Sequence, residues 1–305
     1  MKFKSLQSVD KNCLANVDIH LSFRGLELDD RCEFVAQRFK QDEKKENFVV
    51  NFCANSMTFS VNENRIKFRD LNSRLSELIS LEEKCKIALD ATSLGVVELL
   101  FLLRWLMRES QSLDIRIIYV EPDNYPNNLS SGSNFGRHEF NLSSSSVGYK
   151  SLPGFSKTAS SSKKMHVIAL LGFERVRLGQ LLQNDEGAYI DSITPIFGVP
   201  GFKPSYDKHS AFQNIKALID KGETPRFSSA NNPFTTYQEL EFIRSSMPDE
   251  IINVAPIGTK PMAIGACIFL LNNQNSNVGL LFDHPQKNKG RTKGISKVHI
   301  YSLCS

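Results

Sequence analysis

Hydrophobic and polar positions follow two periods along the chain. Short apolar runs rich in β-branched residues predict strands, and longer stretches with apolar residues three and four apart predict helices. The predicted strands are 86–90, 113–120, 165–171, 188–197, 251–255, 278–282 and 298–303, and the predicted helices are 96–109, 175–183, 209–221, 236–247 and 262–271. Thr235 and Thr236 are the N-cap candidates of helix 236–247. This alternation predicts an α/β fold with a mainly parallel, Rossmann-like sheet and helices on both faces.

Two composition changes suggest the domain organisation. Residues 1–84 contain a βαβ-like pattern and are expected to form an N-terminal α/β unit packed on the body, with 85–305 as the Rossmann-like domain. Between about 127 and 164 the chain is rich in serine, glycine and asparagine, but aromatic residues interrupt it at Phe135, Phe140, Tyr149 and Phe155. We expect an insertion that docks on the body, and the alternative is a divider between two lobes.

A short similarity links the two halves. SFRGLELDDR at 22–31 and LLGFERVR at 170–177 each place an aromatic residue and a glutamate at a strand end, before a helix that carries arginine. Chance is favoured over an internal duplication, because glutamate and arginine are common near helix starts.

Polar side chains follow five of the predicted strands. In open α/β sheets, ligands bind beyond the carboxyl ends of the strands, so we expect these loops to converge on one edge. Each loop also has a simpler interpretation: Asp90 could cap the following helix, and Glu174 with Arg175 could form surface ion pairs. The ligand-binding candidates in these loops are Asp90, Thr92, Ser93, Glu121, Glu174, Arg175 and Asn232.

The segment Ile251 to Gly265, IINVAPIGTKPMAIG, predicts a strand, a tight loop and a helix N-terminus. Gly258 allows close approach of a ligand, Thr259 offers a hydroxyl, Lys260 a charge, and Pro261 suits the first helical turn. This pattern predicts a phosphate or nucleotide site. A βα turn with a solvated lysine is the alternative, and the spacing is not that of a Walker A motif.

Composition and charge exclude only a few kinds of partner and site. The 305 residues carry a formal net charge of +4, which is too mild to require a nucleic-acid partner. The basic loop 287–297 predicts phosphate or nucleic-acid contact, or else a solvated hairpin loop. Six scattered cysteines without a CxxC pair indicate a reducing cytoplasm and no structural zinc. The most apolar run, 96–107, is too short to span a bilayer, so no membrane contact is expected.

Known catalytic motifs are missing from the sequence, and no cofactor can be assigned. The histidines are scattered, and the candidate weighed is His284, which follows Asp283 at a strand end; a metal or acid/base site there is not favoured. An enzymatic interpretation would therefore use Asp90, Glu121 or Glu174 as acid or base beside the 258–260 loop.

The run INVAPIGTKPMAIGA resembles the strand, loop and helix of CARF domains, the Rossmann-like sensors of cyclic oligonucleotides in prokaryotic defence systems. The match covers about fifteen residues, and Ile257 stands where that family usually has a first glycine. The resemblance implies ligand contacts at Gly258, Thr259 and Lys260, with Thr92 and Ser93 next, and it implies a homodimer.

Three functions follow from these patterns. The first is a cytosolic sensor that binds a nucleotide-like ligand and signals to a partner protein, in antiviral defence. The second is an enzyme acting on a nucleotide or phosphorylated small molecule in the same crevice. The third is a non-catalytic subunit of a larger complex.

Overall fold

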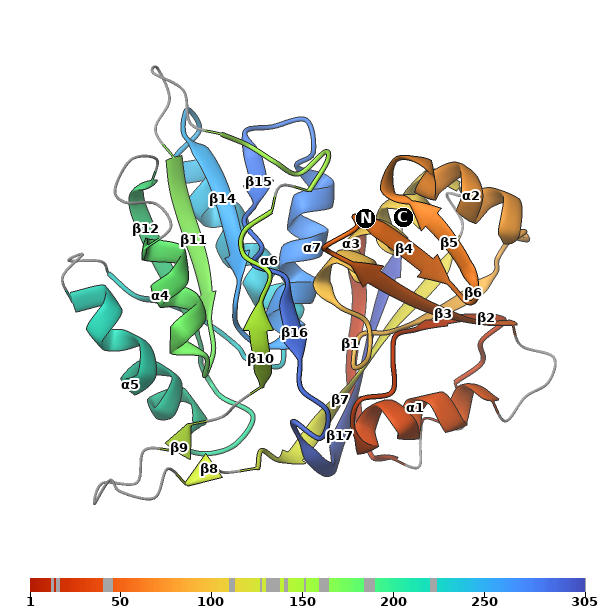
Figure 1. Ribbon diagram of the computed structural model, residues 1–305, viewed down its shortest axis with the longest axis horizontal. Coiled ribbons are helices and arrows are strands. Elements are labelled where there is room, and N and C mark those ends of the chain that lie inside the picture. Colours follow the sequence, from red (N-terminus) through yellow and green to blue (C-terminus); the bar gives the residue numbers. More distant parts are fainter. Residues whose placement is uncertain are drawn as a thin grey trace. The chain divides into compact units, whose positions relative to one another are not determined.

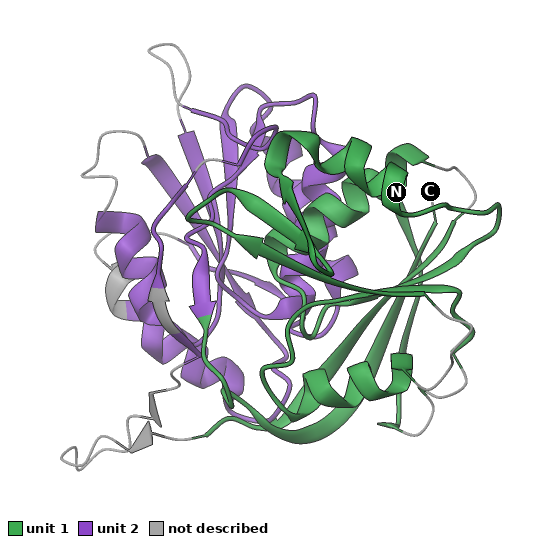
Figure 2. Cartoon of the chain, turned by 45° about the vertical axis from the view of Figure 1, so that its right-hand side comes forward, with its two compact units in different colours: residues 1–126, 287–305 green, residues 127–286 purple. Residues whose placement is uncertain are grey.

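The chain forms two compact units, each with its own sheet (Figure 2). Unit 1 comprises residues 1–126 and 287–305, and unit 2 comprises residues 127–286. The computed structural model describes residues 1–11, 14, 17–40, 46–109, 113–126, 128–129, 138–139, 142–150, 152–158, 165–183, 190–219 and 224–304.

Unit 1 is built on an eight-stranded mixed sheet with the order β1-β17-β7-β6-β2-β3-β4-β5 (Figure 1). Strands β7, β6, β2 and β3 are parallel, β17 pairs antiparallel with β7, and β1 pairs antiparallel with β17. Its elements are β1 (Lys2–Val9), β2 (Leu21–Arg24), α1 (Asp30–Lys40), β3 (Glu46–Cys53), β4 (Thr58–Val61), β5 (Asn64–Lys67), η2 (Phe68–Asp70), α2 (Leu71–Leu78), β6 (Lys86–Asp90), α3 (Val96–Glu109), β7 (Asp114–Asn124) and β17 (Lys293–Cys304).

Helices cover both faces of this sheet. Val35 and Phe39 of α1 pack on one face against Val120 and Val298. On the other face, the Trp105 ring of α3 meets Phe23 of β2 edge-on, with ring centroids 6.0 Å apart. The boundary expected after residue 84 differs from the observed division, because β6 is paired in the sheet of unit 1, between β2 and β7.

Unit 2 is built on a five-stranded sheet in which every pair is parallel, with the order β13-β12-β11-β14-β15. The order reverses beside the first strand, so the sheet is doubly wound: α4 and α5 lie on one face and α6 and α7 on the other (Figure 1). The sheet and its helices are β11 (Met165–Leu171), α4 (Arg175–Gln183), β12 (Ile190–Gly198), α5 (Tyr206–Ile219), β13 (Arg226–Ser228), α6 (Pro233–Ser246), β14 (Ile251–Pro256), α7 (Lys260–Asn272) and β15 (Val278–Leu280).

The mainly parallel sheet predicted from the sequence is found in unit 2, whereas the sheet of unit 1 is mixed. The chain is α/β as expected. Strand β7 continues to Asn124, so Glu121 lies inside a strand and not in the loop after it. Helix α6 starts at Pro233 with Asn232 as its N-cap, which corrects the choice of Thr235 or Thr236. No described helix combines the length and apolar character needed to cross a bilayer.

Four short strands complete the described chain: β8 (Asn128–Leu129), β9 (His138–Glu139), β10 (Ser143–Ser146) and β16 (Pro285–Lys287). Strand β10 pairs with β16, and the Ser146 hydroxyl donates to the Asp283 carbonyl at 2.5 Å. Phe155 is buried, and its carbonyl accepts from the Leu280 N–H. Ser146 and Phe155 of the predicted insertion thus bond to other residues of unit 2, while Phe135 and Phe140 lie outside the described residues.

Candidate functional site

Each unit has a point where the strand order reverses, and such switch points are where α/β sheets bind ligands. In unit 1 the point lies between β2 and β6, and in unit 2 between β11 and β14. The five polar loops predicted to share one edge therefore belong to two sheets. That expectation was wrong because the sequence pattern of a strand does not specify which sheet it joins.

In unit 2, two glycine-containing loops meet at the switch point. A Cβ atom at Gly172, after β11, would lie 3.2 Å from the Cα atom of Gly258, after β14. A Cβ atom at Gly258 would lie 3.0 Å from the carbonyl oxygen of Leu171. A side chain at either position would thus force its neighbour to shift by a few tenths of an ångström, so glycine on both sides favours this close approach of the two backbones.

The loop after β14 leads into α7, which begins at Lys260, two residues before the predicted start at Met262. Thr259 is the N-cap: its hydroxyl accepts from the Met262 N–H and donates to the Ala230 carbonyl at 2.6 Å. Pro261 occupies the first helical turn, where its missing N–H costs nothing. Gly258, Thr259 and Lys260 are all half-buried, so solvent reaches each of them.

The loop after β13 joins the same edge. Asn232 caps α6 by accepting from the Phe234 N–H at 3.0 Å, and Pro233 follows in the first turn. A Cβ atom at Gly198, the last residue of β12, would lie 3.0 Å from Ala230 Cβ and 3.4 Å from Met262 Sδ. The close contacts described for these loops therefore bring together the ends of β11, β12, β13 and β14.

Glu174 lies on this edge but is held by the chain. It accepts from Arg177 at 3.3 Å and from the Ser143 hydroxyl. Arg177 also makes a bidentate ion pair with Asp283, at 2.6 and 2.7 Å. Burial opposes the charge of Arg177, but its hydrogen bond with Asp283 and the charges of Asp283 and Glu174 raise its pKa. Arg175, by contrast, is exposed.

The predicted residues of unit 1 are buried and bonded to one another. Asp90 is 0% exposed, Thr92 1% and Ser93 5%. Asp90 accepts from the Thr92 N–H and the Ser93 hydroxyl, so it holds the turn after β6 and does not cap α3, which begins at Val96. Burial raises the pKa of Asp90 in spite of these hydrogen bonds. The Gly25 N–H donates to the Ser93 hydroxyl at 2.8 Å, so the loop after β2 closes the switch point of unit 1.

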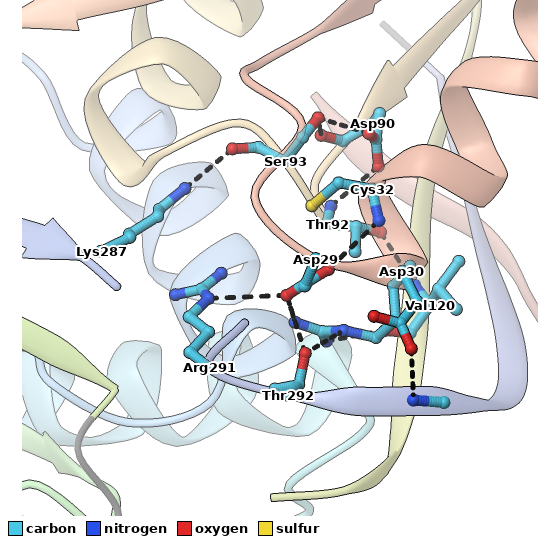
Figure 3. Close-up of polar contacts among 12 residues, drawn as sticks. Asp29, Asp30, Cys32, Asp90, Thr92, Ser93, Val120, Lys287, Arg291 and Thr292 are labelled. Atoms are coloured by element: carbon cyan, nitrogen blue, oxygen red, sulfur yellow. Dashed lines mark hydrogen bonds and ion pairs between the residues drawn. The ribbon is translucent and has the colours of Figure 1, made fainter. Parts of the chain in front are cut away.

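The basic loop also turns inward in unit 1 (Figure 3). Lys287 donates to the Ser93 carbonyl at 2.8 Å, and Arg291 lies 3.7 Å from Asp29. Asp29 also accepts from Arg31 and from the Thr292 hydroxyl. The expected loop 287–297 is shorter than predicted, because β16 ends at Lys287 and β17 begins at Lys293.

Glu121 faces a residue that the sequence did not suggest. Its carboxylate accepts from His299 Nε2 at 3.0 Å, and Glu121 is 4% exposed.

The Asp283–His284 pair makes its contacts within unit 2, since Asp283 binds Arg177 and His284 Nε2 lies 3.4 Å from the Lys150 carbonyl. Among the described residues, no three His, Cys, Asp or Glu side chains are grouped to hold a metal ion.

The two groups of predicted residues thus differ in access to solvent. Gly258, Thr259, Lys260, Glu174, Arg175 and Asn232 lie at the carboxyl edge of unit 2 and are half-buried or exposed, whereas Asp90, Thr92, Ser93 and Glu121 are buried in unit 1. Sequence reasoning missed the contact of Gly172 with Gly258, although a glycine after a strand in each of the two loops was a usable signal.

Compared with models of known protein families and with curated proteins, the chain gives no match.

Proposed function

We propose that the carboxyl edge of unit 2 binds the phosphate of a nucleotide-like ligand, and that the chain is a cytosolic sensor of that ligand acting with a second copy or a partner protein. The observation that carries the proposal is the approach of Gly172 and Gly258 at the β11–β14 switch point, directly before the N-terminus of α7. Backbone N–H groups at a helix N-terminus and a neighbouring lysine favour an anion.

The resemblance to CARF domains supports the same site. The fifteen matching residues form β14, the glycine loop and the first turns of α7, which is the arrangement that the resemblance implies. A cyclic oligonucleotide is therefore the first ligand to test, and prokaryotic antiviral defence is the setting in which such a sensor would act.

The contacts that the carboxylates make within the chain favour binding over catalysis. Glu174, the carboxylate predicted on this edge, is already bonded to Arg177 and Ser143. Asp90 and Glu121 belong to the sheet of unit 1. A general base needs to reach the proton that it removes, and these side chains are committed to contacts within the chain.

Binding of cyclic oligonucleotides and mononucleotides to the full chain tests the proposal. Lys260→Ala should weaken binding of the preferred nucleotide about ten- to a hundredfold, because a hydrogen bond to a charged group contributes about 1.5–3 kcal/mol. Titration calorimetry measures the affinity, and the rise in thermal unfolding temperature provides a second readout.

Lys208→Ala is the matched control, because Lys208 is an exposed lysine of the same unit, on α5. It should bind like the wild-type chain. Equal affinity of the Lys260→Ala and wild-type proteins would refute the proposed site, and a wild-type chain that binds none of the nucleotides would refute the sensor function.

A further inference from the structure

Three neighbouring strands of unit 1 bring a serine, a histidine and a glutamate into one line. Ser8 lies on β1, His299 on β17 and Glu121 on β7, and these strands are adjacent in the sheet (Figure 1). The Ser8 hydroxyl is 2.8 Å from His299 Nδ1, and Glu121 Oε2 is 3.0 Å from His299 Nε2. We propose that Ser8, His299 and Glu121 form a nucleophilic site, separate from the edge of unit 2, that hydrolyses carboxylic esters.

We assign the tautomer of His299, and with it the direction of proton movement, from its two hydrogen-bond partners. An ionised carboxylate only accepts, so His299 Nε2 carries the proton that is donated to Glu121. The neutral ring then has its lone pair on Nδ1, where it accepts from the Ser8 hydroxyl. Nucleophilic catalysis by a hydroxyl needs three groups in this order: the hydroxyl, a base that takes its proton, and a carboxylate that orients the base.

The sheet buries the base while leaving the nucleophile exposed. His299 is 1% exposed and stacks with Tyr119 and Tyr301, with ring centroids 6.1 and 6.2 Å away. Ser8, directly opposite His299 in the strand register, is exposed. The register of β17 on β7 shifts between Ile295 and Val298, beside Glu121, and such bulges re-aim side chains.

Strand β1 also supplies what an ester would need. It is the edge of the sheet, so alternate backbone N–H groups point away from β17, and one of them lies within one residue of Ser8 to stabilise an oxyanion. Leu6, two positions earlier on the same face, is 41% exposed and offers an apolar surface for the acyl group.

The reaction balances without a cofactor. Ser8 Oγ forms a bond to the carbonyl carbon while its proton moves to His299 Nδ1, and the ester C–O bond breaks as the leaving alcohol takes that proton. Water then attacks the acyl-serine, passing a proton through His299 back to Ser8 Oγ, and the carboxylic acid leaves.

Labelling of the full chain with a fluorophosphonate probe, mapped by peptide mass spectrometry, tests this site. The wild-type protein should carry the adduct on Ser8, and Ser8→Ala should carry none there and should lose hydrolysis of p-nitrophenyl butyrate. Ser5→Ala is the matched control, because Ser5 is an exposed serine of the same strand, and it should be labelled like the wild type.

Glu121→Gln tests the orienting carboxylate. The amide N–H₂ group of glutamine would donate to Nε2 and move the ring proton to Nδ1, so labelling of Ser8 should slow at least tenfold in a protein whose thermal unfolding shows that it is folded. No adduct on Ser8 in the wild-type chain, equal labelling of Ser5 and Ser8, or unchanged labelling of a folded Glu121→Gln protein would each overturn the proposal.

Discussion

At the scale of single residues, burial decides which polar groups can meet a ligand. The sequence offered Lys260 as the leading ligand-binding candidate, and Asp90 and Ser93 as further polar candidates after a strand. In the structure, Asp90 and Ser93 are buried and bonded to each other, whereas Lys260 is half-buried at the first position of α7. Hydrogen bonds within the chain satisfy a buried group as well as a ligand would, so residue type alone does not distinguish a binding residue from one that holds a turn.

Lys287 gives a prediction about pH at this scale. Burial, and then the charge of Arg291, lower the pKa of Lys287 to about 8, below the value of about 10.4 for an unfolded chain. Between these values the unfolded chain binds more protons, so this residue's contribution to the free energy of unfolding rises with pH. The difference in that free energy between the wild type and Lys287→Met should therefore rise by about 1–2 kcal/mol from pH 8 to pH 10, measured by urea unfolding.

Lys289→Met serves as the comparison, because Lys289 is exposed in the same loop. The difference in free energy of unfolding between Lys289→Met and the wild type should stay constant from pH 8 to pH 10. A Lys287→Met difference that is equally constant would contradict the lowered pKa.

At the scale of elements, glycines show how backbone spacing shapes unit 2. Gly265 lies on α7 where α6 packs against it, and a Cβ atom there would collide with the Pro233 carbonyl and lie 3.0 Å from Thr236 Cβ. Gly179, on α4, has nothing within 4 Å of such an atom among the described residues. The same residue type therefore serves close packing in one helix and only lowers helix propensity in the other.

Alanine substitutions should separate these two cases. Gly265→Ala should lower the free energy of unfolding by about 1–3 kcal/mol, because the two helices must move apart. Gly179→Ala should raise it by about 0.5–1 kcal/mol, because alanine loses less conformational entropy in a helix. Urea unfolding of both variants measures the changes, and changes of the same sign would show that the α6–α7 contact is not as close as described.

At the scale of the whole molecule, the chain contains two α/β sheets, each with a glycine after its first parallel strand. Gly25 follows β2, and a Cβ atom there would lie 2.6 Å from the Ser93 carbonyl oxygen; Gly172 follows β11 and faces Gly258 in the same way. The similarity between 22–31 and 170–177 falls at these equivalent positions. Unit 1 closes its switch point with its own side chains, whereas loop residues at the switch point of unit 2 are solvent-accessible.

This difference predicts where a bound nucleotide protects the backbone. Amide hydrogen exchange should slow in 172–175 and 256–263 when the ligand that binds the full chain is added, because those amides lie at the edge of unit 2. Exchange in 90–95 should not change, since that loop is already closed within unit 1. Protection confined to 90–95 would assign the ligand to the other sheet.

Many bounds of helices and strands could be predicted from the sequence. The bounds of β6, α3, β11 and α4, and the place of Pro261 in the first turn of α7, follow from hydrophobic period and the chemistry of helix starts, which act between residues a few positions apart. Only the tertiary structure decided which strands share a sheet, which carboxylates are buried, and that Ser8 meets His299 across 291 positions. Those outcomes depend on pairing between distant strands, and the period of a strand says nothing about its partner.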